Sequence, residues 1–314
     1  LTAKSHTSDG SDNKGNFKGS LGAQSVVYKG YQYSVFYGGK TNTKKVKGKN
    51  VEFATIKIGR RKVTGGYGAW EISTLKGYQL TSEDAHNRQS IGISEGDGVI
   101  HIAFDHHNNR ELRYARTAKG VADKPGSTKW NNDVFKYVPN LGIKTLDGQQ
   151  TTYPSFNSFP GGNLILYMRN GHANGGEMFV ARYDSKKSKW VSSRLVSSRT
   201  GKYKKTGSAE RGPYTAGGMR VDDKGNLHVA WVWREESFCY KGVKVGIDCN
   251  QGLYYAMSDD EGVNWENNAG KFIANTNQNG RINVNNIGGP VIELNHNLRP
   301  SNVAIGSTYD VVGD

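Results

Sequence analysis

The chain has 314 residues, which is enough for one large domain or two ordinary ones, and no run approaches the roughly 18 apolar residues of a membrane span. Only 35% of the residues are hydrophobic, glycine is abundant at 41, and the 17 tyrosines outnumber the 10 phenylalanines, a composition typical of an all-β protein. The formal net charge of +14 favours a polyanionic partner, either nucleic acid or acidic polysaccharide.

A repeat organises the chain. Four stretches share a glycine before an alternating strand, and these glycines lie 68, 64 and 63 residues apart: 29–37, 97–104, 161–167 and 224–231. A short strand is expected before each one, at 23–28, 89–94, 154–158 and 217–221, and a third strand after it, at 52–58, 112–116, 177–183 and 253–257. A fourth strand is visible at 190–196. Four antiparallel strands at this interval predict the blades of a β-propeller.

Residues 258–265 fit the Asp-box pattern Ser-x-Asp-x-Gly-x-x-Trp, and 183–190 resemble a degenerate copy. We expect a structural role for this hairpin turn, because its Asp and Ser can satisfy turn amides while the Trp packs between blades. A fifth repeat is expected to start at 285–292. Either the N-terminal segment completes that blade, or the natural domain continues beyond residue 314.

Basic clusters at 44–49, 60–62 and 202–205 each lie beside turns, where solvated loops are the expected structure. Cys239 and Cys249 are ten residues apart across a glycine-containing segment, which suits a hairpin disulfide in an exported protein. A metal pair is the alternative. We favour the disulfide because no nearby His, Asp or Glu spacing gives a zinc signature.

The repeat register places six polar residues on one axial face, since the start of a strand lies beside the end of its antiparallel neighbour. His86, Tyr153 and Tyr214 begin inner strands, while His106, Arg169 and Arg234 end the neighbouring strands. Further residues are expected to line or support this groove: Asn87, Arg88, His107, Asn170 and His172. His101 lies inside an alternating strand and is expected to be structural.

The motifs restrict the chemistry. The sequence has no Gly-x-Ser-x-Gly elbow, phosphate loop or metal-binding His-x-x-x-His, and the predicted rim lacks the two carboxylates of an ordinary glycosidase. His, Tyr and Arg suit β-elimination from a uronate instead. A cation there pairs with the sugar carboxylate, while Tyr or His removes the C5 proton and protonates the O4 leaving group.

These residues resemble a known family, the β-propeller ulvan lyases and their BNR-repeat (Asp-box) relatives. The likeness spans about 20–270 and lies in Asp84-Ala85-His86-Asn87, Asp105-His106-His107, Leu112-Arg113-Tyr114, Thr152-Tyr153-Pro154 and Tyr167-Met168-Arg169-Asn170-Gly171. The resemblance implies seven blades. It also implies that His86 and Tyr153 are the acid/base residues, that His106 is a further active-site histidine, that Arg169 neutralises the carboxylate, and that Tyr214 binds substrate. Some relatives carry a structural zinc.

We therefore expect a single β-propeller domain over 1–314 that acts as a polysaccharide lyase on a uronic-acid-containing, sulfated polymer such as ulvan. Arg234, His107, Asn170 and Arg88 are predicted to join Tyr214 in binding it. The expected protein is a secreted monomer whose leader has been removed, without nucleic-acid or membrane partners. No catalytic cofactor is predicted, and a structural zinc or calcium ion is kept as an alternative. The alternative function is a non-catalytic carbohydrate-binding or sialidase-like propeller, although no arginine triad with a Tyr/Glu pair is recognisable.

Overall fold

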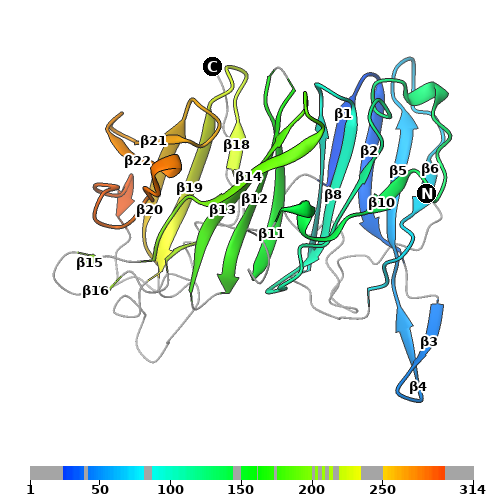
Figure 1. Ribbon diagram of the computed structural model, residues 1–314, viewed down its shortest axis with the longest axis horizontal. Helices are drawn as coiled ribbons and strands as arrows, with labels where there is room; N and C mark the ends of the chain where they lie inside the picture. The colour runs from blue at the N-terminus through cyan, green and yellow to red at the C-terminus, as the bar shows by residue number, and fades with distance from the viewer. Residues whose placement is uncertain are drawn as a thin grey trace.

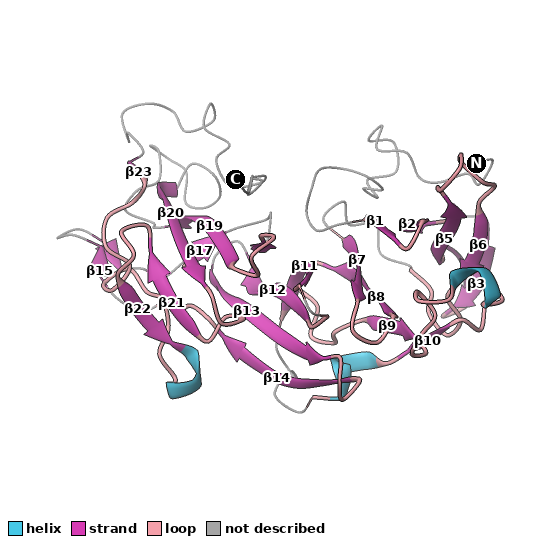
Figure 2. Ribbon diagram, turned by 90° about the horizontal axis from the view of Figure 1, so that it is seen from above, coloured by secondary structure: helices cyan, strands magenta, loops and turns pink. Residues whose placement is uncertain are grey.

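The computed structural model describes residues 24–38, 42–80, 87–143, 150–160, 162–172, 175–199, 202–203, 207–208, 212–214, 219–234 and 250–293. These residues are all-β apart from short 3-10 turns at Pro125–Ser127, Pro139–Gly142 and Thr276–Gln278. Within them no helix is long and apolar enough to cross a membrane. The strands form four successive antiparallel sheets along an open arc (Figures 1 and 2). The predicted propeller blades are confirmed, and the arc is not closed.

Blade I has the order β1-β2-β5-β6. Its strands are β1 (Ser25–Tyr28), β2 (Tyr31–Tyr37), β5 (Ile56–Lys62) and β6 (Glu71–Thr74). The predicted third strand at 52–58 was wrong in its position. Residues 49–53 form β4 (Lys49–Phe53), which pairs only with β3 (Asn42–Val46) in a separate hairpin inserted before β5.

Blades II and III each contain four strands in sequence order. Blade II consists of β7 (Arg88–Ser94), β8 (Val99–His106), β9 (Tyr114–Thr117) and β10 (Phe135–Tyr137). Blade III consists of β11 (Thr151–Ser158), β12 (Leu164–His172), β13 (Gly175–Asp184) and β14 (Lys189–Leu195). The strand boundaries agree with the predicted repeats to within a few residues.

Blade IV splits its inner strand into β17 (Pro213–Tyr214) and β18 (Met219–Val221), and both pair with β19 (Leu227–Arg234). The sheet continues through β20 (Asn250–Ser258), β21 (Asn264–Asn267) and β22 (Phe272–Asn275). A small hairpin joins β15 (Lys202–Tyr203) to β16 (Gly207–Ser208). The expected fifth repeat does not open a new sheet in the described part of the chain, because β23 (Ile292–Glu293) pairs with β20 and Ile287 packs into the blade IV core.

Apolar side chains fill the spaces between neighbouring blades. One cluster joins blades I and II through Ile58, Ile91 and Trp130, and a second joins blades II and III through Tyr114 and Leu166. A third cluster between blades III and IV is built on buried aromatic residues that include Tyr167, Trp231 and Trp265. Fully burying one such large apolar side chain contributes about 1.5–3 kcal/mol. The inter-blade layers therefore fix each blade against the next.

The Asp box between β20 and β21 has the predicted structural role. The Asp260 carboxylate accepts hydrogen bonds from the backbone N–H groups of Val263 and Asn264 at 3.1 and 2.7 Å, and from the Ser258 hydroxyl at 2.9 Å. The Trp265 indole is fully buried and donates to the Gly262 carbonyl at 3.0 Å. All of these hydrogen bonds stabilise the hairpin turn.

The candidate site lies where the second strands of the blades end. Strands β2, β8, β12 and β19 point toward the lower edge in Figure 1. The inner strands β7, β11 and β17 begin beside those ends, as the registers Arg88↔His106, Thr152↔Arg169 and Pro213↔Trp233 show. The antiparallel rule thus places those predicted rim residues that the structure describes on one face.

Candidate functional site

Four of the six predicted rim residues meet at the junction of blades III and IV. The Tyr214 ring contacts two guanidinium groups, with Arg169 Cζ 4.7 Å and Arg234 Cζ 3.4 Å from its centroid. Tyr153 packs against the same tyrosine. Both arginines are almost fully buried, at 1% and 3% exposure. Two buried cations around a tyrosine pair form a site suited to an anion.

Tyr153 is presented by a bulge at the start of β11. The pairing with β12 shifts by one residue between Thr152 and Ser155, and Tyr153 has a φ of +55°. A bulky residue in the left-handed region is strained, at a cost of about 1–3 kcal/mol, and such strain gathers at functional sites. A β-bulge re-aims a side chain in this way.

The Tyr153 hydroxyl is held in its protonated form. Burial raises its pKa first, and the charge of Tyr214 and a side-chain hydrogen bond with Tyr214 raise it further. The positive charges of Arg88 and Arg169 act in the opposite direction. The resting site therefore presents a phenol next to cations that favour its ionised form.

Arg169 owes its position to a glycine on the neighbouring strand. A Cβ atom at Gly176 would lie 2.5 Å from Arg169 Cζ and 2.6 and 2.7 Å from its two terminal nitrogens. A Cβ atom at Gly212, whose φ is +68°, would lie 2.3 Å from the Gly176 carbonyl oxygen, and the Gly212 carbonyl accepts the Arg234 backbone N–H at 3.1 Å. Burial lowers the Arg169 pKa to about 10, which leaves it charged at neutral pH. Neither glycine was predicted from the sequence to belong to the site.

The two adjacent histidines of blade II have different surroundings. His107 is half-buried, and its ring stacks on Tyr153 with centroids 6.1 Å apart and an interplanar angle of 14°. His106 is fully buried behind this layer. Its Nε2 accepts the Arg113 backbone N–H at 3.0 Å, and its Nδ1 lies 2.9 Å from the Thr151 hydroxyl. Since that hydroxyl donates to the Asn109 carbonyl at 3.0 Å, Nδ1 carries the proton of a neutral ring.

Burial lowers the pKa of His106 to about 3, and the nearby charge of Arg113 adds to the effect. His101 is likewise fully buried, with its pKa lowered by burial and Nδ1 2.6 Å from the Tyr114 hydroxyl. His228 has the same bond to Tyr255 in blade IV, also at 2.6 Å. The structural role predicted for His101 is confirmed.

A hydrogen-bonded loop holds His106 and His107 in place. Asp105, with a φ of +57°, accepts from Arg113 at 2.5 Å and from the Tyr78 hydroxyl, and its backbone N–H donates to the Tyr37 hydroxyl at 2.9 Å. The Asn108 N–H donates to the Thr152 hydroxyl at 2.9 Å. Blades I, II and III are thus tied together directly beside Tyr153.

The remaining predicted residues are placed as follows. His86, Cys239 and Cys249 lie outside the described residues, as does the side chain of His172. Arg88 lies opposite His106 and is close enough to influence Tyr153. Asn170 follows Arg169 in β12, so its side chain leaves the opposite face of the sheet. Among the described residues no three His, Cys, Asp or Glu side chains are grouped to hold a metal ion.

A lysine-rich hairpin lies on the same side of the molecule as the site. Strands β3 and β4 project from the lower edge in Figure 1, beyond the end of β2. Lys45, Lys47 and Lys49 are exposed there. The Tyr37 hydroxyl at the end of β2 contacts Asp105, so the hairpin starts next to the site.

The four-bladed arc defines a β-propeller protein, and the Tyr–Arg cluster at its axial face is a candidate anion-binding site. A sequence model described as a BNR repeat-containing family member matches residues 31–307, and the chain belongs to this family. The chain is 27% identical over 284 residues to the long isoform of ulvan lyase from Alteromonas sp., and 28% identical over 288 residues to that from Pseudoalteromonas sp. (strain PLSV). Each alignment covers 78% of this chain and 26% of the relative. The chain thus spans about a quarter of these relatives.

Solved structures support the fold. The polysaccharide lyase Uly1 superposes with a TM-score of 0.61 at 18% identity, covering 86% of this chain and 60% of that one. A PL25 ulvan lyase bound to -[GlcA(1-4)Rha3S]- gives a TM-score of 0.53 at 13% identity, covering 83% and 57%. At these identities the likeness concerns the architecture.

Proposed function

We propose that this protein is a polysaccharide lyase that cleaves ulvan, a sulfated polymer containing uronic acid, by β-elimination. The observation that carries the proposal is the cluster in which Tyr153 and Tyr214 adjoin the buried guanidinium groups of Arg169 and Arg234. Relatives named as ulvan lyases, and a related lyase structure bound to a glucuronate–rhamnose sulfate unit, support this substrate class.

The proposed reaction begins with the uronate carboxylate binding at Arg169. A planar guanidinium grips a carboxylate bidentately and stabilises the negative charge that develops when the C5 proton leaves. Electrons of the broken C5–H bond form the C4–C5 double bond while the C4–O4 bond breaks. The departing oxygen takes a proton, and the product carries an unsaturated uronate at its new end.

We assign the acid step to Tyr153 and the base step to His86. The raised pKa of Tyr153 keeps its proton available for the O4 leaving group. The assignment of His86 rests on the family resemblance. His106, whose two ring nitrogens are engaged with Arg113 and Thr151, is proposed as a positioning residue that fixes the loop carrying His107.

Substrate binding is assigned to the groups around this centre. His107 offers a half-buried ring beside Tyr153, and Tyr214 with Arg234 extends the cationic surface beyond Arg169. Arg88 and Asn170 stay predicted substrate contacts. Because the substrate is a polymer, we propose that the protein acts outside the cell.

Mass spectrometry of the products from purified ulvan tests this function. Elimination yields oligosaccharides that are one water lighter than hydrolysis products and that carry a C4–C5 double bond. Hydrolysis products would instead indicate a sialidase-like or other glycosidase chemistry. Tight binding of ulvan without any cleavage would make the protein a carbohydrate-binding propeller.

A further inference from the structure

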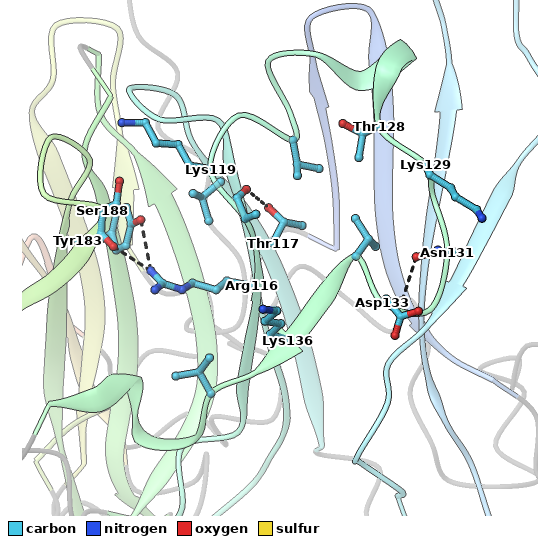
Figure 3. A pocket seen from close by; sticks show the side chains of 15 residues that line it. Arg116, Thr117, Lys119, Thr128, Lys129, Asn131, Asp133, Lys136, Tyr183 and Ser188 are labelled. Carbon is cyan, nitrogen blue, oxygen red and sulfur yellow. Dashed lines mark hydrogen bonds between the residues drawn. The ribbon is translucent and has the colours of Figure 1, made fainter.

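A cavity lies far from the Tyr153 site, between the outer strands of blades II and III (Figure 3). Its volume is about 600 Å³, and it is lined by the ends of β8, β9 and β10, by the β9–β10 connection (118–134) and by the turn after β13. Val99 in this cavity and His106 at the site are at opposite ends of β8. Seven residue-to-residue steps along the strand place them roughly 23 Å apart.

Positive charge surrounds this cavity. Arg116, Lys119, Lys129 and Lys136 line it, against a single carboxylate, Asp133. Asp133 is already paired with Lys76 at 2.5 Å. In the described part of the chain no carboxylate lies within ion-pair distance of Lys119, Lys129 or Lys136. The lining therefore carries an unbalanced positive charge.

Two of these cations come from paired strand positions. Arg116 in β9 and Lys136 in β10 are register partners, and like charges at directly opposite positions destabilise a strand pair. The Arg116 guanidinium is held in place, since it donates to the Ser188 carbonyl at 3.0 Å and to the Tyr183 hydroxyl at 3.5 Å. A bound anion would offset the like charges carried by these two positions.

The shape of the cavity favours an extended ligand with an apolar side. Figure 3 shows the amino groups of Lys119 and Lys129 pointing to different sides, so the charge is spread along the cavity rather than focused on one point. Val99, Val121 and Val134 add an apolar surface. A sulfated deoxysugar combines these features, because its sulfate matches the basic rim and its methyl and C–H groups match the valines.

We propose that this cavity is a second, non-catalytic binding site for a sulfated saccharide segment of the polymer substrate. The inference rests on the proposed function for its choice of ligand. A polymer held at this site is kept at high effective concentration near the catalytic face, which raises the affinity for long chains without changing the chemistry. Short oligosaccharides cannot reach both sites and gain nothing.

The test compares two triple variants with the parent protein. Lys119→Ser/Lys129→Ser/Lys136→Ser removes charge from the cavity, whereas Lys62→Ser/Lys224→Ser/Lys271→Ser removes the same charge from exposed positions elsewhere. Binding of intact ulvan is measured by calorimetry in a Tyr153→Phe background, and cleavage of polymer and of tetrasaccharide is measured with Tyr153 present. We expect the cavity variant to bind polymer about tenfold more weakly than the control variant, with unchanged kcat/KM on the tetrasaccharide.

Equal polymer affinity in the two triple variants would overturn the proposal. So would cavity-dependent binding of RNA, or of desulfated ulvan as tightly as native ulvan, because the ligand would then be a different polyanion or no sulfate ester. If the parent protein binds ulvan through the cavity lysines but cleaves none of it, the second site stands and the proposed lyase activity fails.

Discussion

Replacing Gly176 with alanine is expected to disable the site through Arg169. The added Cβ would lie 2.5–2.7 Å from three guanidinium atoms, whereas ordinary van der Waals contact begins at 3.4 Å. Arg169 must therefore move by roughly 1 Å, and a displacement of that size in a catalytic group can lower turnover about 10²-fold. Because the clash is with the far end of a flexible side chain, the fold should accommodate it.

The assay is kcat/KM on ulvan together with the thermal midpoint, for Gly176→Ala and for Gly289→Ala as control. Gly289 has open space at its Cβ position, so its alanine variant should keep both values. In an Arg169→Ala background, Gly176→Ala should lower kcat/KM little further, because both changes act on the Arg169 guanidinium. Native kcat/KM in the single variant, with an unchanged thermal midpoint, would refute the reasoning.

Three further changes probe the surroundings of the site. Tyr214→Phe keeps the aromatic face between Arg169 and Arg234 and should lower substrate affinity only slightly. Tyr214→Leu removes the cation–π contacts and should raise KM about tenfold. Equal KM values for the two variants would argue against a role for the aromatic ring. The pKa of His106 is lowered to about 3 in the folded protein, so neutral His106 contributes its full stabilisation above the unfolded pKa near 6.5 and loses it as the pH falls toward 3. His106→Asn should therefore flatten the dependence of the thermal midpoint on pH between 6.5 and 3. An unaltered pH dependence would contradict this prediction. The triple variant Lys45→Ser/Lys47→Ser/Lys49→Ser should have a higher KM for ulvan than the parent protein at low salt, and the two KM values should become equal at high salt. A difference in KM that does not depend on salt would exclude electrostatic attraction by the β3–β4 hairpin.

The blade pattern could be predicted because it depends on local signals. Each blade repeats a turn glycine followed by a strand with alternating polarity, and Asp260 satisfies its turn in the way the Asp-box spacing indicates. The third strand of blade I could not be placed, because 49–53 and 56–62 both have strand character. Only the pairing of β2 with β5 decides between them, and that is a tertiary contact.

The sequence was sufficient to predict on which face of the propeller the candidate site lies. Antiparallel geometry brought Tyr153, Arg169, Tyr214 and Arg234 together, but strand alternation could not distinguish the surroundings of His106 and His107. The left-handed Asp105 and the register shift between β7 and β8 interrupt that alternation immediately before them. Gly176 was missed because its role is to leave space for Arg169. A glycine inside a strand, as in Gly175–Gly176, is the available signal, since it marks close approach of another group.

The most direct test of the lyase assignment follows ultraviolet absorbance while the protein acts on ulvan. Only elimination creates the absorbing C4–C5 double bond. We predict a steady rise in absorbance for the parent protein and a rate lowered by ~10² or more for Tyr153→Phe, which keeps the ring but loses the transferable proton. Full activity in Tyr153→Phe, or depolymerisation without the absorbance band, would contradict the assignment.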